Sequence, residues 1–190
     1  VGWDITRYEF IPNSSIVKFN SFSMSIFSFI LIYSLFGIVI TKNKNEVISD
    51  TPRPGWKPFL EGKDIAAYSI KSINKFINYD AGLLHRARTK EIFEQPEKIL
   101  LQRITGGSRP LKAAYDNMQY YNKESINNII LKNNYDYSYK YILGLLNSKL
   151  INWYYSNMFT NESRLTVNLS KEYLSQIPIP VADKIAQVPF

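Results

Sequence analysis

The stretch YSYKYILGLLNSKLINWYYSNMFTNESRLTVNLSKEYLSQIPIP, residues 137–180, decides the architecture expected for this chain. Its first half has apolar residues at helical spacing, namely Ile142, Leu146, Leu150, Trp153 and Tyr154. We expect one helix of about twenty residues, roughly 30 Å long, capped by Asp136 or Ser138. The second half ends in Ile-Pro-Ile-Pro at 177–180, where the prolines exclude a helix and favour an extended exit.

The two faces of this helix have different expected roles. The polar residues lie mostly off the apolar stripe, namely Asn147, Ser148, Lys149 and Asn152. Trp153 lies on the stripe, so we expect it in the core or in a contact with another domain. The paired tyrosines are interpreted as core or rim residues rather than as platforms for base stacking. They are Tyr120, Tyr121, Tyr154 and Tyr155.

Composition limits the classes of protein that fit. The 190 residues suit one domain, with a β-rich part at 1–135 and a helical segment at 136–190. No cysteine is present, which excludes disulfides and thiolate metal sites and favours a reducing, cytoplasmic location. The lone histidine, His85, is expected at the surface or in a turn, and it disfavours a Ser-His triad. The net charge of +7 favours an anionic partner, although many soluble proteins are equally basic.

Short strands are expected in the first two thirds of the chain. Residues 71–79, 98–104, 113–121 and 125–131 have strand patterns, and 98–104 is apolar enough to be buried on both faces. Asp64 is expected to cap a helical turn through Tyr68, and Thr89 one at 90–94. Strands followed by helix predict an α+β fold.

Residues 22–40 are the most ambiguous stretch. They contain no charged residue and are nearly long enough to span a bilayer. Serines punctuate the stretch, Gly37 interrupts it, and residues 21–26 alternate as in a strand. We therefore favour a buried helix or strand over a membrane helix.

Three stretches in order resemble the TaqI-like C-terminal specificity domain of adenine-specific DNA methyltransferases and type IIG restriction-modification enzymes. They are KPFLEGKDIAAYSI at 57–70, FEQPEKILLQRITGG at 93–107, and YILGLLNSKLINWYY with LSQIPIP at 141–155 and 174–180. The resemblance implies an irregular, β-helix-like barrel followed by an α-helical hairpin. Its second helix would begin near Ile185 and be truncated at Phe190. It also implies a short helix leading to a strand at Gly37-Ile38.

The same resemblance implies a division of labour within a longer, bacterial parent protein. This half would read double-stranded DNA, while an N-terminal methyltransferase domain, outside this chain, would flip out and methylate adenine. S-adenosylmethionine, and Mg²⁺ if the parent also cuts DNA, would bind there. No cofactor or metal is expected in this chain.

Catalytic signatures are weak in the chain itself. There is no glycine-rich turn for S-adenosylmethionine and no adjacent prolines of the adenine-binding type. Pro96-Glu97-Lys98 is superficially similar to a nuclease motif, but we interpret it as a helix stop followed by a strand. The chain alone is therefore expected not to be catalytic, unless carboxylates far apart in sequence converge on a metal.

Basic residues gather between 86 and 112. Seven lysines and arginines there face three glutamates, a local charge of +4. Such groups neutralise phosphates, and arginine also reads guanine. The loops at 84–88 and 106–112 are the best placed for contact. The candidate DNA-binding residues are Arg86, Arg88, Lys90, Arg103, Ser108, Arg109, Lys112 and Arg164. The competing interpretation is a solvated basic face.

Two functions remain open at this level. The first is a DNA target-recognition domain of a restriction-modification adenine-N6 methyltransferase. The second is a structural module that binds a membrane or another protein through its basic surface, since acidic lipid attracts lysine and arginine.

Overall fold

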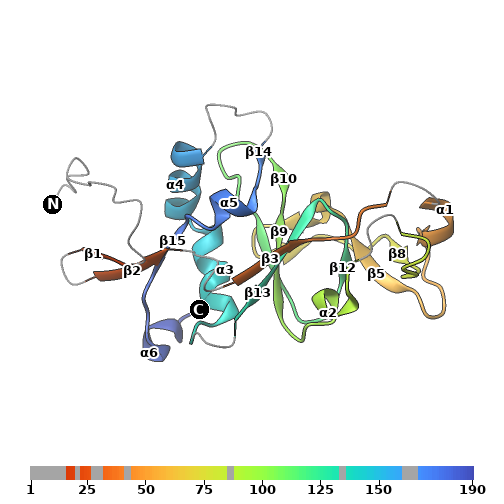
Figure 1. The fold of residues 1–190 in the computed structure, drawn as a ribbon, viewed down its shortest axis with the longest axis horizontal. Coiled ribbons are helices and arrows are strands. Elements are labelled where there is room, and N and C mark those ends of the chain that lie inside the picture. The colour runs from red at the N-terminus through yellow and green to blue at the C-terminus, as the bar shows by residue number, and fades with distance from the viewer. Residues whose placement is uncertain are drawn as a thin grey trace.

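A four-stranded antiparallel sheet forms the middle of the elongated molecule (Figure 1). The computed structural model describes residues 16–19, 22–26, 32–40, 44–84, 88–132, 136–159 and 167–190. The strands of this central sheet are, in order, β11 (Ala113–Asp116), β9 (Lys98–Gln102), β13 (Ile126–Leu131) and β3 (Ile32–Phe36). Residues 98–101 of β9 are all buried, which confirms a strand covered on both faces.

A second four-stranded sheet lies at one end of the molecule, near the short helix α1 (Lys44–Val47). Its strands are, in order, β12 (Tyr121–Asn122), β5 (Lys57–Leu60), β8 (Phe76–Ile77) and β4 (Ile48–Ser49). Helix α2 (Lys90–Phe93) adds Phe93, whose ring stacks on Tyr121 with centroids 4.7 Å apart. These aromatic rings build a core separate from that under the C-terminal helices.

Shorter pairings tie distant parts of the chain together. A three-stranded sheet joins β1 (Ile16–Phe19), β2 (Phe22–Ile26) and β15 (Pro178–Pro180). Two ribbons pair β6 (Ile65–Ala66) with β7 (Ser69–Ile70), and β10 (Ile104–Thr105) with β14 (Val167–Asn168). The β15 strand confirms the extended Ile-Pro-Ile-Pro exit, and its prolines sit on an edge strand as expected.

The largest core lies between the central sheet and the C-terminal helices. Those helices are α3 (Tyr139–Asn147), α4 (Lys149–Phe159), α5 (Lys171–Leu174) and α6 (Lys184–Gln187). Ile142 and Leu146 of α3 pack with Ile99 and Leu101 of β9 in this core. Residues on both sides of position 135 thus share one core, and the division into two parts there stays a prediction.

The prediction of a single long helix in the first half of residues 137–180 is wrong, because Ser148 divides this region into the two helices α3 and α4. Ser148 has extended backbone angles (φ −65°, ψ 151°), and its hydroxyl accepts a hydrogen bond from Ile151 N at 3.1 Å. A serine in that conformation starts a new helix. The apolar stripe is therefore not continuous: Leu150 and Trp153 are 70% and 55% exposed, so Trp153 is not a core residue. Ser138 caps α3, as expected.

Three further expectations about the architecture need correction. The α+β class is confirmed, but the described strands form separate open sheets and no closed barrel, because β3 and β11 end the central sheet without pairing with each other. The first helix of the expected α-helical hairpin is broken into α3 and α4, whereas a helix does begin near Ile185 as expected, the four-residue α6 that starts at Lys184. The expected short helix before Gly37 is replaced in the described residues by strands β2 and β3.

Within the ambiguous stretch at 22–40, the described residues form strands β2 and β3, which confirms the strand interpretation. Within the described residues, no helix is long and apolar enough to cross a membrane.

Two local predictions near the second sheet are also corrected. The helical turn there is the 3₁₀ turn η2 (Gly62–Asp64), so Asp64 ends it rather than starting it. Its carboxylate instead accepts from Glu61 N at 2.8 Å. Of the strand expected at 71–79, only β8 forms a ladder. In contrast, the turn at α2 begins after Thr89 as expected, although the Thr89 side chain makes no capping hydrogen bond.

Candidate nucleic-acid interface

Phe36, at the end of β3, brings two of the predicted arginines together. The guanidinium carbon of Arg88 lies 3.8 Å from the centre of the Phe36 ring, and that of Arg103 lies 5.3 Å from it. Arginine over an aromatic face is an attractive contact worth about 0.5–2 kcal/mol. We call Phe36, Arg88 and Arg103 the Phe36 cluster.

A close backbone approach places Phe36 at this point. Gly37 donates its N–H to Ile126 O at 3.1 Å, and Ile38 donates to Asn122 O at 2.8 Å. A Cβ atom on Gly37 would lie 2.3 Å from Asn122 O, well inside the contact limit. Only glycine fits there. The end of β3 is therefore pressed against the β12–β13 connection, which sets the position of the ring.

Arg103 is held from three directions between β9 and β10. Its N–H donates to Ser125 O at 2.8 Å, and its carbonyl accepts from Leu169 N at 2.9 Å. Its guanidinium Nη1 donates to Glu124 O at 3.2 Å. The side chain is half-buried. These contacts fix both the backbone and the guanidinium group of Arg103.

Arg88 lies just before α2, Lys90 is the first residue of α2, and both have Tyr79 as a neighbour. The Tyr79 hydroxyl donates to Arg88 O, and the Lys90 ammonium lies 5.6 Å from the centre of the Tyr79 ring. Burial, together with the charges of Glu91 and Glu94, raises the pKa of Tyr79. The phenol therefore stays protonated and able to donate. Three predicted cations thus lie against two aromatic rings.

A buried ion pair supports the far end of α2. Lys98 Nζ lies 2.5 Å from Asp116 Oδ2 and donates to Phe93 O at 2.6 Å, and both charged side chains are fully buried. Burial lowers the pKa of Lys98, while the Asp116 carboxylate opposes that shift. α2 ends at Phe93 and β9 begins at Lys98, which confirms the structural interpretation of Pro96-Glu97-Lys98.

The second basic region is the loop between β10 and β11. Ser108 and Arg109 are exposed, Lys112 is half-buried, and Gly107 has a positive φ of 81° that favours glycine. We call residues 106–109 the glycine loop. No interaction in the described part of the chain connects its side chains to the Phe36 cluster.

Two asparagines of the C-terminal helices anchor the backbone that follows the glycine loop and leads into β11. Asn152 Oδ1 accepts from Leu111 N at 2.8 Å. Asn147 accepts from Ala113 N at 3.0 Å and donates to Ala113 O at 2.9 Å. Both amides are buried. We call Asn147 and Asn152 the asparagine clasp. The sequence pattern puts both residues outside the apolar stripe of the helix, and the structure shows that they bind the backbone at Leu111 and Ala113.

The structure therefore places the predicted residues in two groups. It brings Arg88, Lys90 and Arg103 together at aromatic rings, and it puts Ser108, Arg109 and Lys112 in or beside the glycine loop. Arg86 and Arg164 lie outside the described residues, as does His85. Their roles stay predictions.

Sequence reasoning missed Phe36, Tyr79 and the asparagine clasp. Nothing in the sequence connects Phe36 to arginines 52 and 67 positions later. The clasp left a weak signal, since Asn147 and Asn152 are amides inside a helical stretch with a strong apolar stripe. Buried amides require hydrogen-bond partners, so such positions indicate a backbone to be bound.

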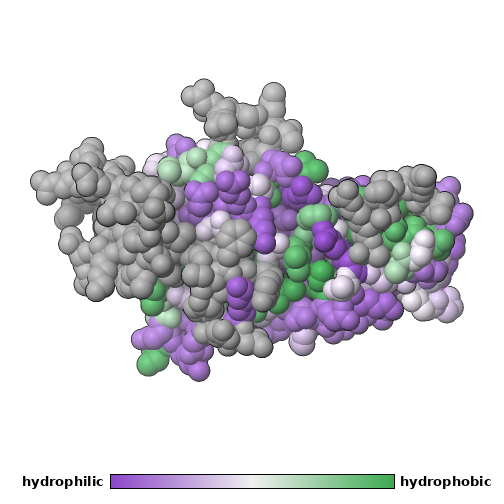
Figure 2. All heavy atoms as spheres, viewed as in Figure 1, coloured by the Kyte–Doolittle hydropathy of each residue, from purple (hydrophilic) through white to green (hydrophobic). Residues whose placement is uncertain are grey.

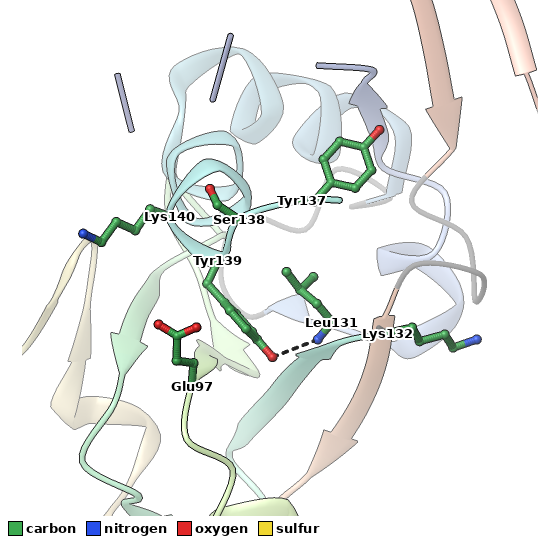
Figure 3. A pocket seen from close by; sticks show the side chains of 7 residues that line it. All are labelled: Glu97, Leu131, Lys132, Tyr137, Ser138, Tyr139 and Lys140. Carbon is green, nitrogen blue, oxygen red and sulfur yellow. Dashed lines mark hydrogen bonds between the residues drawn. The ribbon is translucent and has the colours of Figure 1, made fainter. Parts of the chain in front are cut away.

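Surface character alone does not mark an interface. Figure 2 shows mostly hydrophilic residues on the described part of this face, with an apolar stretch over the middle of the molecule. A pocket of about 360 Å³ lies at the start of α3. Figure 3 shows Lys132 and Lys140 pointing away from its centre, whereas Glu97 and the Tyr139 ring lie within it. Because the one carboxylate of the lining lies inside the pocket and both lysines turn outward, its interior does not suit an anion.

Metal chemistry has no evident site in this part of the molecule. Among the described residues, no group of three or more histidine, cysteine, aspartate or glutamate side chains could hold a metal ion.

Comparison with known proteins places this geometry in context. Over 100 residues, 52% of the chain, it is 33% identical to the "Putative type II restriction enzyme and methyltransferase RM.MjaORFECS2P" of Methanocaldococcus jannaschii, and the match covers 8% of that protein. The fold is similar to that of the HsdS subunit from Thermoanaerobacter tengcongensis, with a TM-score of 0.53 and 12% identity, over 94% of this chain and 37% of that one. At that identity the likeness concerns the fold alone.

Residues 57–179 match the family described as TaqI-like C-terminal specificity domain. The matched region is more than half of the 190 residues, and it takes in the motifs that begin at Lys57, Phe93 and Tyr141. It also contains Arg88, Arg103 and the glycine loop. The chain belongs to the TaqI-like C-terminal specificity domain family.

Proposed function

We propose that this chain is the DNA target-recognition domain of a restriction-modification protein and that it binds double-stranded DNA. The observation that carries the proposal is the family match, which contains Arg88, Arg103 and the glycine loop. Fixed arginines supply affinity by displacing counterions from phosphates. Exposed loop side chains supply contacts to base edges.

The rest of the proposal concerns the whole protein. We propose that it methylates adenine at N6, with or without an endonuclease activity, and that its catalytic groups lie outside this chain. The support is the printed name of the archaeal relative and the DNA methyltransferases that the motifs resemble. S-adenosylmethionine, and Mg²⁺ for cleavage, would bind to the rest of the protein, in the cytoplasm where the DNA is.

Binding to duplex DNA tests the proposal directly. The intact protein is titrated into labelled duplex pools of random sequence, and the bound fraction is sequenced through successive rounds. We expect one short sequence to be enriched, with affinity for it at least about 10³-fold above that for a scrambled duplex. Uniform recovery of all sequences, or no binding at about 50 mM salt, would contradict a recognition function.

The reaction of the parent protein has its own test. Intact protein, the enriched duplex and radiolabelled S-adenosylmethionine are incubated, and digested nucleosides are separated. Label in N6-methyladenine supports the assignment, and label in methylcytosine refutes it.

A further inference from the structure

Two positive charges share one aromatic ring without a counter-charge. In the described part of the chain, neither Arg88 nor Arg103 forms an ion pair with a carboxylate. Like charges held close together repel each other, and the repulsion grows as water is excluded. The fold nevertheless brings both arginines to Phe36. An anion from outside the chain would remove that repulsion.

The free hydrogen-bond donors of the pair match such an anion. A guanidinium group that lies over a ring keeps its N–H donors in its own plane, where they can meet oxygens in a bidentate fork. Arg88 Nε is buried and has no hydrogen-bond partner within the described residues, so the donors of Arg88 that can meet an oxygen from outside are those at its Nη atoms. The one side-chain hydrogen bond of Arg103 in the described structure uses Nη1. The pair therefore retains unused donors.

The spacing of the pair suits a phosphodiester backbone. The guanidinium carbons cannot be further apart than the sum of their distances to the Phe36 centre, 3.8 Å and 5.3 Å. Each strand of duplex DNA carries about one phosphate per 3.4 Å of helix axis. Two arginines so placed can contact one phosphate or two neighbouring ones.

We propose that the Phe36 cluster binds the phosphate backbone of duplex DNA and adds affinity at every sequence while selecting none. The inference rests on the proposed function and assigns the choice of sequence to other residues. Arg103 is held by three hydrogen bonds, so it cannot follow the differing edges of bases. The exposed Ser108 and Arg109 are free of such restraint in the described structure.

The experiment compares affinity and its salt dependence. Dissociation constants of the intact protein are measured for the enriched duplex and for a scrambled duplex between about 50 and 200 mM salt. The variants are Arg88→Ala, Arg103→Ala and, as a charge-matched control, Lys184→Ala. Lys184 is 77% exposed and lies in α6. Thermal unfolding is recorded for each protein.

For both arginine variants we expect the slope of log affinity against log salt to become shallower by about 0.9 per phosphate lost. The affinities for the two duplexes should fall by the same factor. Lys184→Ala should leave the slope and the affinities unchanged. A slope unchanged in both arginine variants, or a loss confined to the enriched duplex, overturns the inference while the DNA-binding function stands.

Neutral phosphates provide a second measurement that a damaged fold cannot imitate. Each phosphate of the enriched duplex is replaced in turn by an uncharged methylphosphonate. We expect one position, or two adjacent ones, whose replacement weakens the wild type but has no further effect on the Arg88→Ala, Arg103→Ala double variant. Additive losses at every position overturn the inference.

Two remaining outcomes separate the alternatives. If the wild type binds no duplex, the proposed function fails and this inference with it. If vesicles of anionic phospholipid bind the wild type more tightly than DNA does, and Arg103→Ala abolishes that binding, the phosphate partner is lipid and the DNA assignment is wrong.

Discussion

The Phe36 cluster and the glycine loop use basic residues in opposite ways. In the cluster, Arg88 and Arg103 are half-buried, stacked on a ring and held by backbone contacts. In the loop, Ser108 and Arg109 are exposed, and the asparagine clasp holds only the backbone that follows, at Leu111 and Ala113. The contrast teaches that charge in a sequence does not distinguish a rigid contact from an adaptable one, whereas burial and hydrogen bonding do.

The largest loss of stability is expected when the buried ion pair between Lys98 and Asp116, next to α2, is broken. Lys98→Ala should destabilise the protein by about 3–5 kcal/mol, because it leaves the Asp116 carboxylate buried without its cation. Denaturant unfolding measures the loss. Lys57→Ala, an exposed lysine of β5, is the control and should change stability by less than about 0.5 kcal/mol. Equal stability of the two variants would remove Lys98 from the support of α2.

The asparagine clasp should rank second. Its loss should affect the backbone at Leu111 and also the α3–α4 break, because Asn152 donates to Leu146 O and Ser148 O at 3.0 Å each. Asn152→Ala leaves Leu111 N without its acceptor, at a cost of about 1–3 kcal/mol. Hydrogen exchange at Leu111 should accelerate, while exchange at Arg103 N stays slow. Asn157→Ala, which loses an exposed hydrogen bond within α4, is the matched control. Acceleration at both sites would show that the two regions are not independent.

Replacing a glycine should cost more stability next to the Phe36 cluster, at Gly37, than in the glycine loop, at Gly107. Gly37→Ala places a methyl group against Asn122 O and should cost about 1–3 kcal/mol. Gly107→Ala meets no neighbour within 4 Å, so it should cost only about 1 kcal/mol for its positive φ. Chemical denaturation of both variants checks the order, and a larger cost at Gly107 would contradict it.

Removing a loop cation should affect binding and not folding. Arg109→Ala is expected to change stability by less than about 0.5 kcal/mol, because Arg109 is exposed. If Arg109 reads a base, the difference in binding free energy between the enriched and the scrambled duplex should be smaller in the variant by about 1–3 kcal/mol. An equal loss on both duplexes would instead make it a phosphate contact and blur the distinction between the two regions.

The smallest effect concerns the acid stability contributed by Glu61, the residue before η2. Burial raises the pKa of Glu61, but hydrogen bonds and charges from Lys75 and Lys63 outweigh it, and the net pKa is lowered. A lowered pKa in the folded state stabilises the protein above the unfolded value near 4.5, and that stabilisation is lost as pH falls below it. In Glu61→Gln, the free energy of unfolding should therefore fall less between neutral and acidic pH than in the wild type, by about 1 kcal/mol or less. If the free energy of unfolding of the variant fell with pH as much as that of the wild type, Glu61 would not contribute to the acid sensitivity.

Local pattern predicted several elements correctly and failed where packing decided. The buried run at Lys98–Leu101 and the Pro178–Pro180 exit follow from apolar density and from proline geometry. The helix break at Ser148 was missed, because nothing in its neighbours interrupts the apolar period. Of the candidate site, the cations were identified, but the Phe36 platform was not, because ring contacts join residues far apart in sequence.

By itself, the sequence determined the α+β class, the family and the cationic stretch at 86–112, because these depend on composition, local period and short motifs. Only the tertiary structure decided which cations meet and which amides are buried. Phe36 reaches Arg88 and Arg103 because β3 pairs with β13 and Gly37 allows the backbones to touch. Such non-local contacts depend on how sheets and helices pack, which no short stretch of residues encodes.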